Sequence, residues 1–475
     1  MKALSDTLLS RLWQDWDTRE ELIREVVQDR LRTQPPPRAD DHLIASYFFA
    51  LRTTTLEHIG KEIVYHSTSG TKDLPPGSLL EQCTGRCLGT DAFDGSGRLG
   101  LVHMAFPLKM LLQEDGHLTS TDILHTVAGA IVFDVYENLD ARLVQIDIPP
   151  SVIRTFPGPA YGPEGLRKRT GFSPSEPAFG TILKPTAGIT PDDVERLVEE
   201  AADCPLFLFV KEDENLYPRL SYSPVEERTR RALAAIRRAA DRRKGRGLLF
   251  APHITGTPHE IAETIQAVVE CGAEAVMFSE SFAIGAVRLV REATRHLPNP
   301  PAIYGHNAGI GVRTRAIWRE VIDLLARLDG IDFRQTAPVK PGKAFLKPYG
   351  AEWEASESVL TRPIDGIRPT MIARAGALDQ GNIGLNLEDA ARRGLEDKIL
   401  FLSGSAINSI RGSSGKPDPK LGAQAMTEAL EVHRSGELRG VPAEEHLQAL
   451  AALAQRRGLA ALLTALQQRY PGKVA

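Results

Sequence analysis

Short apolar runs that end in polar residues recur along most of the chain, and amphipathic stretches lie between them. The run Pro205–Val210 is rich in bulky side chains and is followed at once by charged residues, which is typical of a buried strand that reaches a solvent-facing edge. Gly180–Leu183 is a similar run that also ends at a lysine. The segment between the two runs predicts a helix, with Thr190 as N-cap and Pro191 at the first helical position.

Strands and helical patterns continue to alternate, for example with a helical pattern at 258–265 after the third strand. This order predicts an α/β protein built on a (β/α)8 TIM barrel of about 250 residues, whose chemistry lies at the C-terminal ends of the strands. The eight strands are expected near residues 179–184, 206–211, 247–253, 274–279, 301–306, 331–336, 370–375 and 398–403.

Two helical regions and a smaller domain flank the predicted barrel. Apolar residues recur at helical spacing over 5–33 and again over 443–470. Before the barrel, strand-like segments mix with a helix, which predicts a smaller α+β N-terminal domain with strands at 43–51, 99–106 and 142–148 and a helix at 120–130. The expected divisions are 1–38 (N-terminal helical extension), 39–155 (α+β domain), 156–440 (barrel) and 441–475 (C-terminal helical tail).

Composition narrows the class of protein. At 475 residues the chain is too long for one typical core, and its net charge of −4 gives no basic field for a nucleic-acid partner. No apolar run approaches the ~18–20 residues of a membrane span, and the first residues lack the apolar core of a signal peptide. Few cysteines and no zinc spacing predict reduced thiols and a cytoplasmic location; the cysteines are Cys83, Cys87, Cys204 and Cys271.

Charged residues follow the strand at 206–211 in an unusual order. Lys211 and Asp213 point to one side of a strand, and Glu214 lies at the following turn. Carboxylates suit a hard divalent cation, whereas an ammonium repels one. Lys211 could therefore act as a ligand only as a carbamate formed with CO2. The alternative is a solvated charge run at the end of a strand.

Two segments resemble the signature segments of the RuBisCO large-chain superfamily. They are Gly180–Pro185 and Val210–Asn215, and the similarity runs from about Leu43 to Gly436, including Ile148–Pro150 and Gly415–Pro419. The region before the barrel then resembles the α+β N-terminal domain of this family. The resemblance also implies a homodimer whose active sites lie between one barrel and the neighbouring N-terminal domain.

The resemblance implies a Mg2+ ion held by carbamylated Lys211, Asp213 and Glu214, with Lys184 as the acid/base that moves a proton beside a carbonyl. It also implies one phosphate site, where small residues and a helix N-terminus let backbone N–H groups approach phosphate oxygens. The residues expected there are Thr71, from the neighbouring subunit, and Gly376, Ser403, Gly404 and Ser405.

Other positions depart from the family's carboxylases. The second phosphate site loses an arginine, a histidine and a serine, at Asn307, Gln335 and Ala375, which predicts a monophosphate substrate. Ile131 replaces an asparagine and His66 a glutamate of the N-terminal domain, so CO2 fixation is not expected.

Further candidates lie on other strands. His306 ends the fifth strand and is a candidate for substrate binding or proton relay, and Lys343 lies nearest to the catalytic lysine of the loop after strand six. His253, Arg334 and Arg374 could contact substrate or serve the structure.

The leading hypothesis is a RuBisCO-like, Mg2+-dependent enzyme that forms an enediolate from a phosphorylated 3-oxo sugar acid and then decarboxylates it or hydrolyses a C–C bond. The runner-up is an enolase or isomerase of a ketose monophosphate, of the methylthioribulose-phosphate type. The family's salvage enolases use a lysine where this chain has Ile131. Because 121–141 contains no lysine, the salvage-enolase activity is disfavoured. A third hypothesis is an inactive barrel that serves as a scaffold or regulator.

Overall fold

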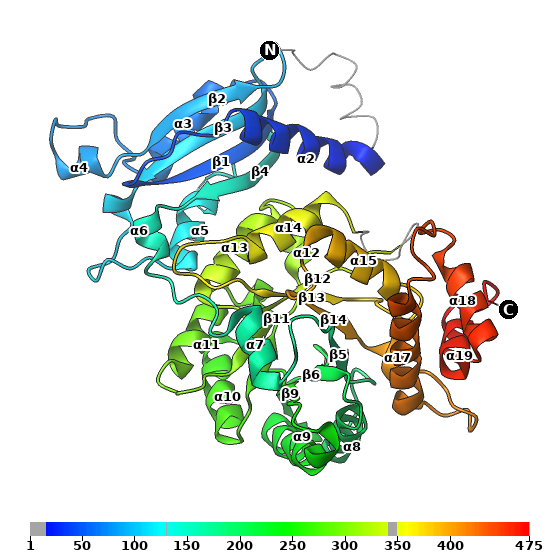
Figure 1. Ribbon diagram of the computed structural model, residues 1–475. Helices are drawn as coiled ribbons and strands as arrows, with labels where there is room; N and C mark the ends of the chain where they lie inside the picture. Colours follow the sequence, from blue (N-terminus) through cyan, green and yellow to red (C-terminus); the bar gives the residue numbers. More distant parts are fainter. Residues whose placement is uncertain (1–15, 130, 341–348, 475) are drawn as a thin grey trace.

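In the computed structural model, which describes residues 16–129, 131–340 and 349–474, a parallel eight-stranded barrel forms the centre of the molecule (Figure 1). Each strand is short and fully or largely buried, and each overlaps one of the eight predicted from the sequence. The strands are β5 (Ala178–Ile182), β6 (Phe207–Lys211), β9 (Leu249–Ala251), β10 (Ala275–Phe278), β11 (Ala302–Gly305), β12 (Phe333–Thr336), β13 (Met371–Ala375) and β14 (Ile399–Ser403).

The strands pair in the order β10-β11-β12-β13-β14-β5-β6-β9. A parallel bridge between His253 and Met277 brings the two outer strands together and closes the barrel. Inside it, the rings of Phe209 and Phe333 have centroids 4.8 Å apart, and those of Phe209 and Tyr304 are 5.5 Å apart. Burial of each such ring stabilises the fold by roughly 1.5–3 kcal/mol. The barrel is therefore a packed core.

Helices surround the barrel, with apolar faces toward the strands. The predicted caps are present: the Thr190 side chain accepts from the backbone N–H of Asp193, whose carboxylate accepts in return from the backbone of Thr190. The helices of this layer are α7 (Gly162–Thr170), α8 (Pro191–Ala202), α9 (Val225–Ala239), α10 (Pro258–Glu270), α11 (Ala286–Thr294), α12 (Ile310–Arg313), α13 (Arg319–Asp329), α14 (Ala351–Thr361), α15 (Ile383–Arg393), α16 (Ser405–Asn408) and α17 (Pro419–Ser435).

An antiparallel sheet precedes the barrel, in the order β2-β3-β1-β4. Its apolar core continues into α13, through Val321, Leu325 and Leu328, so the sheet domain packs on the barrel (Figure 1). The elements are β1 (His42–Leu51), β2 (Arg86–Ala92), β3 (Leu99–Pro107), β4 (Asn138–Asp147), α3 (Leu56–Ser67), α4 (Leu79–Gln82), α5 (Ser120–Ala128) and α6 (Pro150–Ile153).

Helices also occur at both ends of the described chain. The predicted N-terminal helix is α2 (Trp16–Thr33), while its expected first part, 5–15, lies outside the described residues. The C-terminal region is two helices, α18 (His446–Arg457) and α19 (Ala460–Arg469), because Gly458 adopts a left-handed φ of 69°. Both lie beside α17 in Figure 1. In the described part of the chain no helix has the length and apolar character to cross a membrane.

Candidate active site

Side chains predicted for metal binding and catalysis meet at the C-terminal ends of β5, β6 and β11. The Lys184 Nζ lies 2.5 Å from Asp213 Oδ2, and the Lys211 Nζ lies 3.6 Å from Glu214 Oε2. His306 Nε2 lies 3.2 Å from the same Glu214 oxygen. The structure therefore brings these five side chains into one cluster, although they come from strands far apart in the chain. Their catalytic roles remain predictions.

The Lys211 amine is enclosed by the barrel. The residue is 0% exposed, its Nζ donates to the Glu212 carbonyl at 3.0 Å, and it lies 5.7 Å from the centroid of the Tyr304 ring. Burial lowers the pKa of Lys211, although the charges of Glu214 and Asp213 act in the opposite direction. Burial thus makes the neutral amine, which is the nucleophilic form, easier to reach than it is in water.

His306 fixes the Glu214 carboxylate. The backbone N–H of Ala308 donates to His306 Nδ1 at 3.1 Å, so Nε2 carries the proton that points to Glu214. Burial lowers the pKa of His306 and, taken alone, raises that of Glu214. The hydrogen bond that His306 donates is the largest effect that opposes burial at Glu214, and on balance the pKa of that carboxyl is lowered. Glu214 is therefore an ionised oxygen donor.

Glu212 points away from this cluster, as strand alternation requires. It is fully buried and bonds Arg228 through both carboxylate oxygens, at 2.8 and 2.9 Å. Its Oε2 also accepts the backbone N–H of His253. The His253 ring contacts the Leu216 carbonyl and Thr255, and burial lowers its pKa to about 4. His253 therefore has a structural role, and Glu212 anchors the strand end.

The predicted phosphate-binding residues lie on the neighbouring strands β13 and β14. Gly376 follows β13 with a φ of 92°, and Gly404 follows β14 beside Lys184. A Cβ on Gly404 would stand 3.2 Å from Lys184 Cε, so this loop adjoins the cluster of lysines and carboxylates. The Ser403 hydroxyl donates to the Leu378 carbonyl at 3.0 Å and holds the two loops together. The expected helix N-terminus is weaker than predicted, because α16 has only 4 residues.

Two predicted residues cannot be placed in this cluster. Thr71 lies in the loop after α3, where its hydroxyl accepts the backbone N–H of Asp73 at 3.3 Å. Its predicted role depends on a second subunit and remains a prediction. Lys343 lies outside the described residues.

The positions that depart from the carboxylase pattern carry uncharged side chains. Asn307 accepts from Arg319 at 3.2 Å, and Gln335 accepts from the Tyr304 hydroxyl at 2.9 Å. Ala375 ends β13 and is buried. These three positions therefore provide no bidentate cation for a second phosphate.

Arg334 and Arg374 pair internally, which settles a choice that the sequence left open. Arg334 bonds Asp323 at 2.6 Å and Glu280 at 2.5 Å, and it is fully buried. Arg374 bonds both oxygens of Glu357, at 3.0 and 2.9 Å. Both guanidinium groups are therefore held by buried carboxylates, and Arg334 Nη2 has no partner among the described residues.

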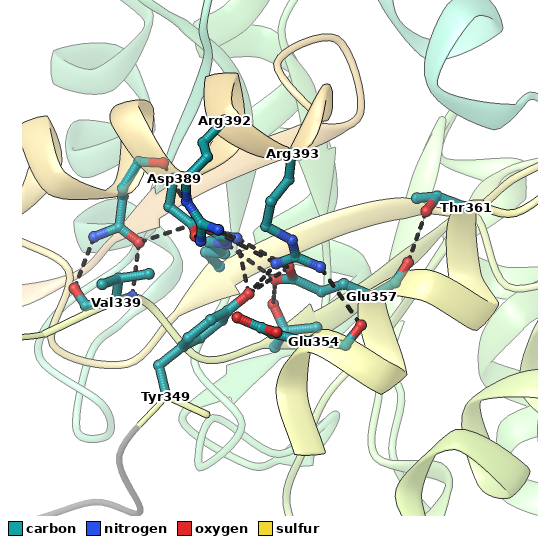
Figure 2. Close-up of polar contacts among 11 residues, drawn as sticks. Val339, Tyr349, Glu354, Glu357, Thr361, Asp389, Arg392 and Arg393 are labelled. Atoms are coloured by element: carbon teal, nitrogen blue, oxygen red, sulfur yellow. Dashed lines mark hydrogen bonds and ion pairs between the residues drawn. The ribbon is translucent and has the colours of Figure 1, made fainter. Parts of the chain in front are cut away.

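Hydrogen bonds around Arg374 also connect the residues that flank 341–348. Tyr349 donates its hydroxyl to Glu357 at 2.7 Å, and Arg393 reaches the same carboxylate at 2.5 Å (Figure 2). On the other side, the Asn386 amide accepts the backbone N–H of Val339 at 2.8 Å and donates to its carbonyl at 2.9 Å. Sequence patterns did not reveal these residues, because each pair spans different elements of the barrel.

Comparisons with known proteins agree with this fold. The model of the ribulose bisphosphate carboxylase large chain, catalytic domain, matches residues 167–348. A 3-oxo-isoapionate-4-phosphate transcarboxylase/hydrolase of Xanthobacter autotrophicus is 35% identical over 221 residues, which cover 44% of this chain and only 50% of that relative. An uncharacterized ribulose bisphosphate carboxylase-like protein of Bordetella bronchiseptica is 30% identical over 66% of this chain and 72% of its own length. The octameric ribulose-1,5-bisphosphate carboxylase/oxygenase of Pyrococcus horikoshii OT3 has a TM-score of 0.75 and 22% identity, over 92% of this chain and 96% of that one, which supports the fold.

Proposed function

The chain belongs to the ribulose bisphosphate carboxylase large-chain family, and we propose that it is a RuBisCO-like, Mg2+-dependent enzyme acting on a phosphorylated 3-oxo sugar acid. The reaction passes through an enediolate and ends in decarboxylation or in hydrolysis of a C–C bond, without CO2 fixation. The observation that carries the proposal is the cluster of Lys184, Lys211, Asp213, Glu214 and His306 at the strand ends.

The donor set fits a magnesium site that needs one more oxygen ligand. Within the described ranges there is no group of three His, Cys, Asp or Glu side chains that could hold a metal ion. Asp213 and Glu214 supply two carboxylates, and the buried Lys211 amine could supply the third group as a carbamate. Mg2+ held by these residues would act as a Lewis acid toward the substrate carbonyl.

Lys184 is the residue that moves the proton in this proposal. Its Nζ lies 2.5 Å from Asp213, next to the metal-binding set, and its stem adjoins Gly404 of the phosphate loop. In decarboxylation, the bond to the carboxylate breaks, its electron pair passes to the carbonyl group, and Lys184 delivers a proton to the carbon that remains. His306 acts through Glu214, whose carboxylate it orients.

The residues of the site favour a monophosphate. Backbone groups around Gly376 and Gly404 suit one phosphate, whereas Asn307, Gln335 and Ala375 offer no cation for a second. The name of the Xanthobacter relative describes carboxyl transfer and hydrolysis on a 3-oxo sugar-acid phosphate, which supports this class of substrate.

Proton and carbon NMR in D2O would test the proposal directly. The protein would be incubated with Mg2+, bicarbonate and a panel of 3-oxo sugar-acid phosphates and ketose 1-phosphates. Release of CO2 or of a carboxylate fragment, absent with Lys184→Ala, is the expected result. Deuterium uptake beside the carbonyl without fragment loss would replace the proposal by an enolase or isomerase. No change with either class of substrate would contradict both and favour a scaffold.

A further inference from the structure

The end of helix α19 is fastened to the loop that follows β13. The Tyr470 hydroxyl donates to Asp379 Oδ1 at 2.7 Å, and Arg469 Nε donates to Asp379 Oδ2 at 3.1 Å. Gly381 makes room for this contact, since a Cβ there would stand 2.6 Å from the Tyr470 ring. The Gln468 amide pairs with the backbone of Arg411, at 2.8 and 2.9 Å. The C-terminal helix therefore has a fixed position beside the predicted phosphate loops.

Arg469 also reaches the second of these loops. Its Nη1 lies 3.3 Å from Ser405 Oγ, and Ser405 is an exposed residue of the predicted phosphate site. The Arg469 side chain is 24% exposed, so it is partly shielded yet accessible. In the described part of the chain, Asp379 and Ser405 are its hydrogen-bond partners. The guanidinium thus spans the loops after β13 and β14, with donor capacity left on both Nη atoms.

The phosphate end of the site needs a cation. Helix α16 has only 4 residues, so its dipole gives little help to a dianion. The Asp379 carboxylate is buried and pairs with Arg469. Burial lowers the pKa of Lys340, and the charge of Asp379 acts in the opposite direction. A guanidinium held by such a carboxylate is preorganised, and it can offer two parallel N–H groups to a phosphate.

We propose that Arg469, from the C-terminal helix, binds the substrate phosphate together with the backbone of Gly404 and Ser405. This inference rests on the proposed function and deepens it, because it assigns the phosphate-end cation to a residue outside the barrel. The C-terminal helix then determines specificity as well as packing. The alternative is a tether, in which Arg469 only ties the helix to Asp379.

Isothermal titration of the full-length protein with inorganic phosphate, in the presence of Mg2+ and bicarbonate, distinguishes the two roles. We expect Arg469→Met to weaken phosphate binding by about tenfold or more, and Arg469→Lys to restore part of it, because a point charge replaces the bidentate group. Arg456→Met is the matched control, since Arg456 is an exposed tail arginine that pairs with Glu437. Tyr470→Phe removes a bond to Asp379 while keeping the guanidinium, and we expect it to leave phosphate binding within about twofold.

Three results would overturn the inference. If Arg469→Met binds phosphate as the unmodified protein does while Gly404→Val loses phosphate binding, the phosphate site exists but Arg469 is not part of it. An equal loss of phosphate affinity in Tyr470→Phe and Arg469→Met would show that Arg469 only holds the helix against Asp379. Absence of phosphate binding by the unmodified protein would remove the phosphate site from the proposed function as well. Circular dichroism of each variant verifies that a loss of binding does not come from unfolding.

Discussion

At the scale of single residues, the buried carboxyl of Asp329 should make stability depend on pH. It ends α13, accepts a hydrogen bond from the Ser120 hydroxyl of α5, and has one oxygen without a partner among the described residues. Burial raises its pKa from 3.8 to about 7, although the Ser120 bond and Arg288 lower it. Between these two pH values the folded state binds the extra proton, so the free energy of unfolding falls as pH rises from about 4 to about 7.

We expect Asp329→Asn to lose this part of the pH dependence, because its side chain does not ionise. Urea unfolding at pH 5 and pH 8 would measure it: relative to the unmodified protein, the variant should gain stability at the higher pH. The exposed carboxyl of Asp365 offers a control, Asp365→Asn, that should follow the unmodified protein. An Asp329→Asn variant with the same pH dependence as the unmodified protein would contradict the assignment.

The sequence predicted site residues whose role depends on position along a strand. Lys211 and Asp213 face the barrel mouth because they alternate with Glu212, and His306 and Gly404 directly follow strands. Pairings between distant elements could not be predicted in this way. Arg469 and Asp379 are 90 positions apart, and no local pattern links them.

At the scale of elements, Glu357 of α14 connects side chains that come from β12, β13, α15 and the segment before α14. Its carboxylate is fully buried and accepts from Arg374, Arg393, Tyr349 and Thr336 (Figure 2). Removing one partner from such a network leaves buried charges without compensation. We therefore expect Glu357→Ala to destabilise the protein by roughly 3–5 kcal/mol.

Denaturant unfolding would measure this cost, with Glu354→Ala as control. Glu354 lies on the same helix, and its side chain is exposed, so its loss should change stability by about 0.5 kcal/mol or less. Similar stabilities for the two variants would show that the network is not a significant support.

The strength of each element's sequence pattern decided whether it could be predicted. Most barrel strands are buried apolar runs with clear ends, and all eight barrel strands overlap a predicted one. Strand β2 was missed because most of its residues are exposed or half-buried and show no alternation, and α3 was not singled out. The division of the C-terminal region into α18 and α19 depends on one glycine, Gly458, in an Ala- and Leu-rich sequence that favours a continuous helix.

At the scale of the whole molecule, the proposed site combines residues of the barrel with one residue of the C-terminal helix. The barrel holds the cluster of lysines and carboxylates, and α19 reaches Ser405 through Arg469. The sheet domain carries Thr71, whose predicted role requires a neighbouring subunit, so the homodimer remains a prediction.

In the proposed function, Lys211, as a carbamate, completes a magnesium site with Asp213 and Glu214. Calorimetric titration of Mg2+ into the protein, with and without bicarbonate, tests it most directly, and Lys211→Met is the matched variant. We expect bicarbonate to tighten Mg2+ binding to the unmodified protein by roughly tenfold or more and to have no effect on Lys211→Met, because that variant lacks the amine that takes up CO2. Equal Mg2+ affinity in both proteins, whether or not bicarbonate is present, would contradict it.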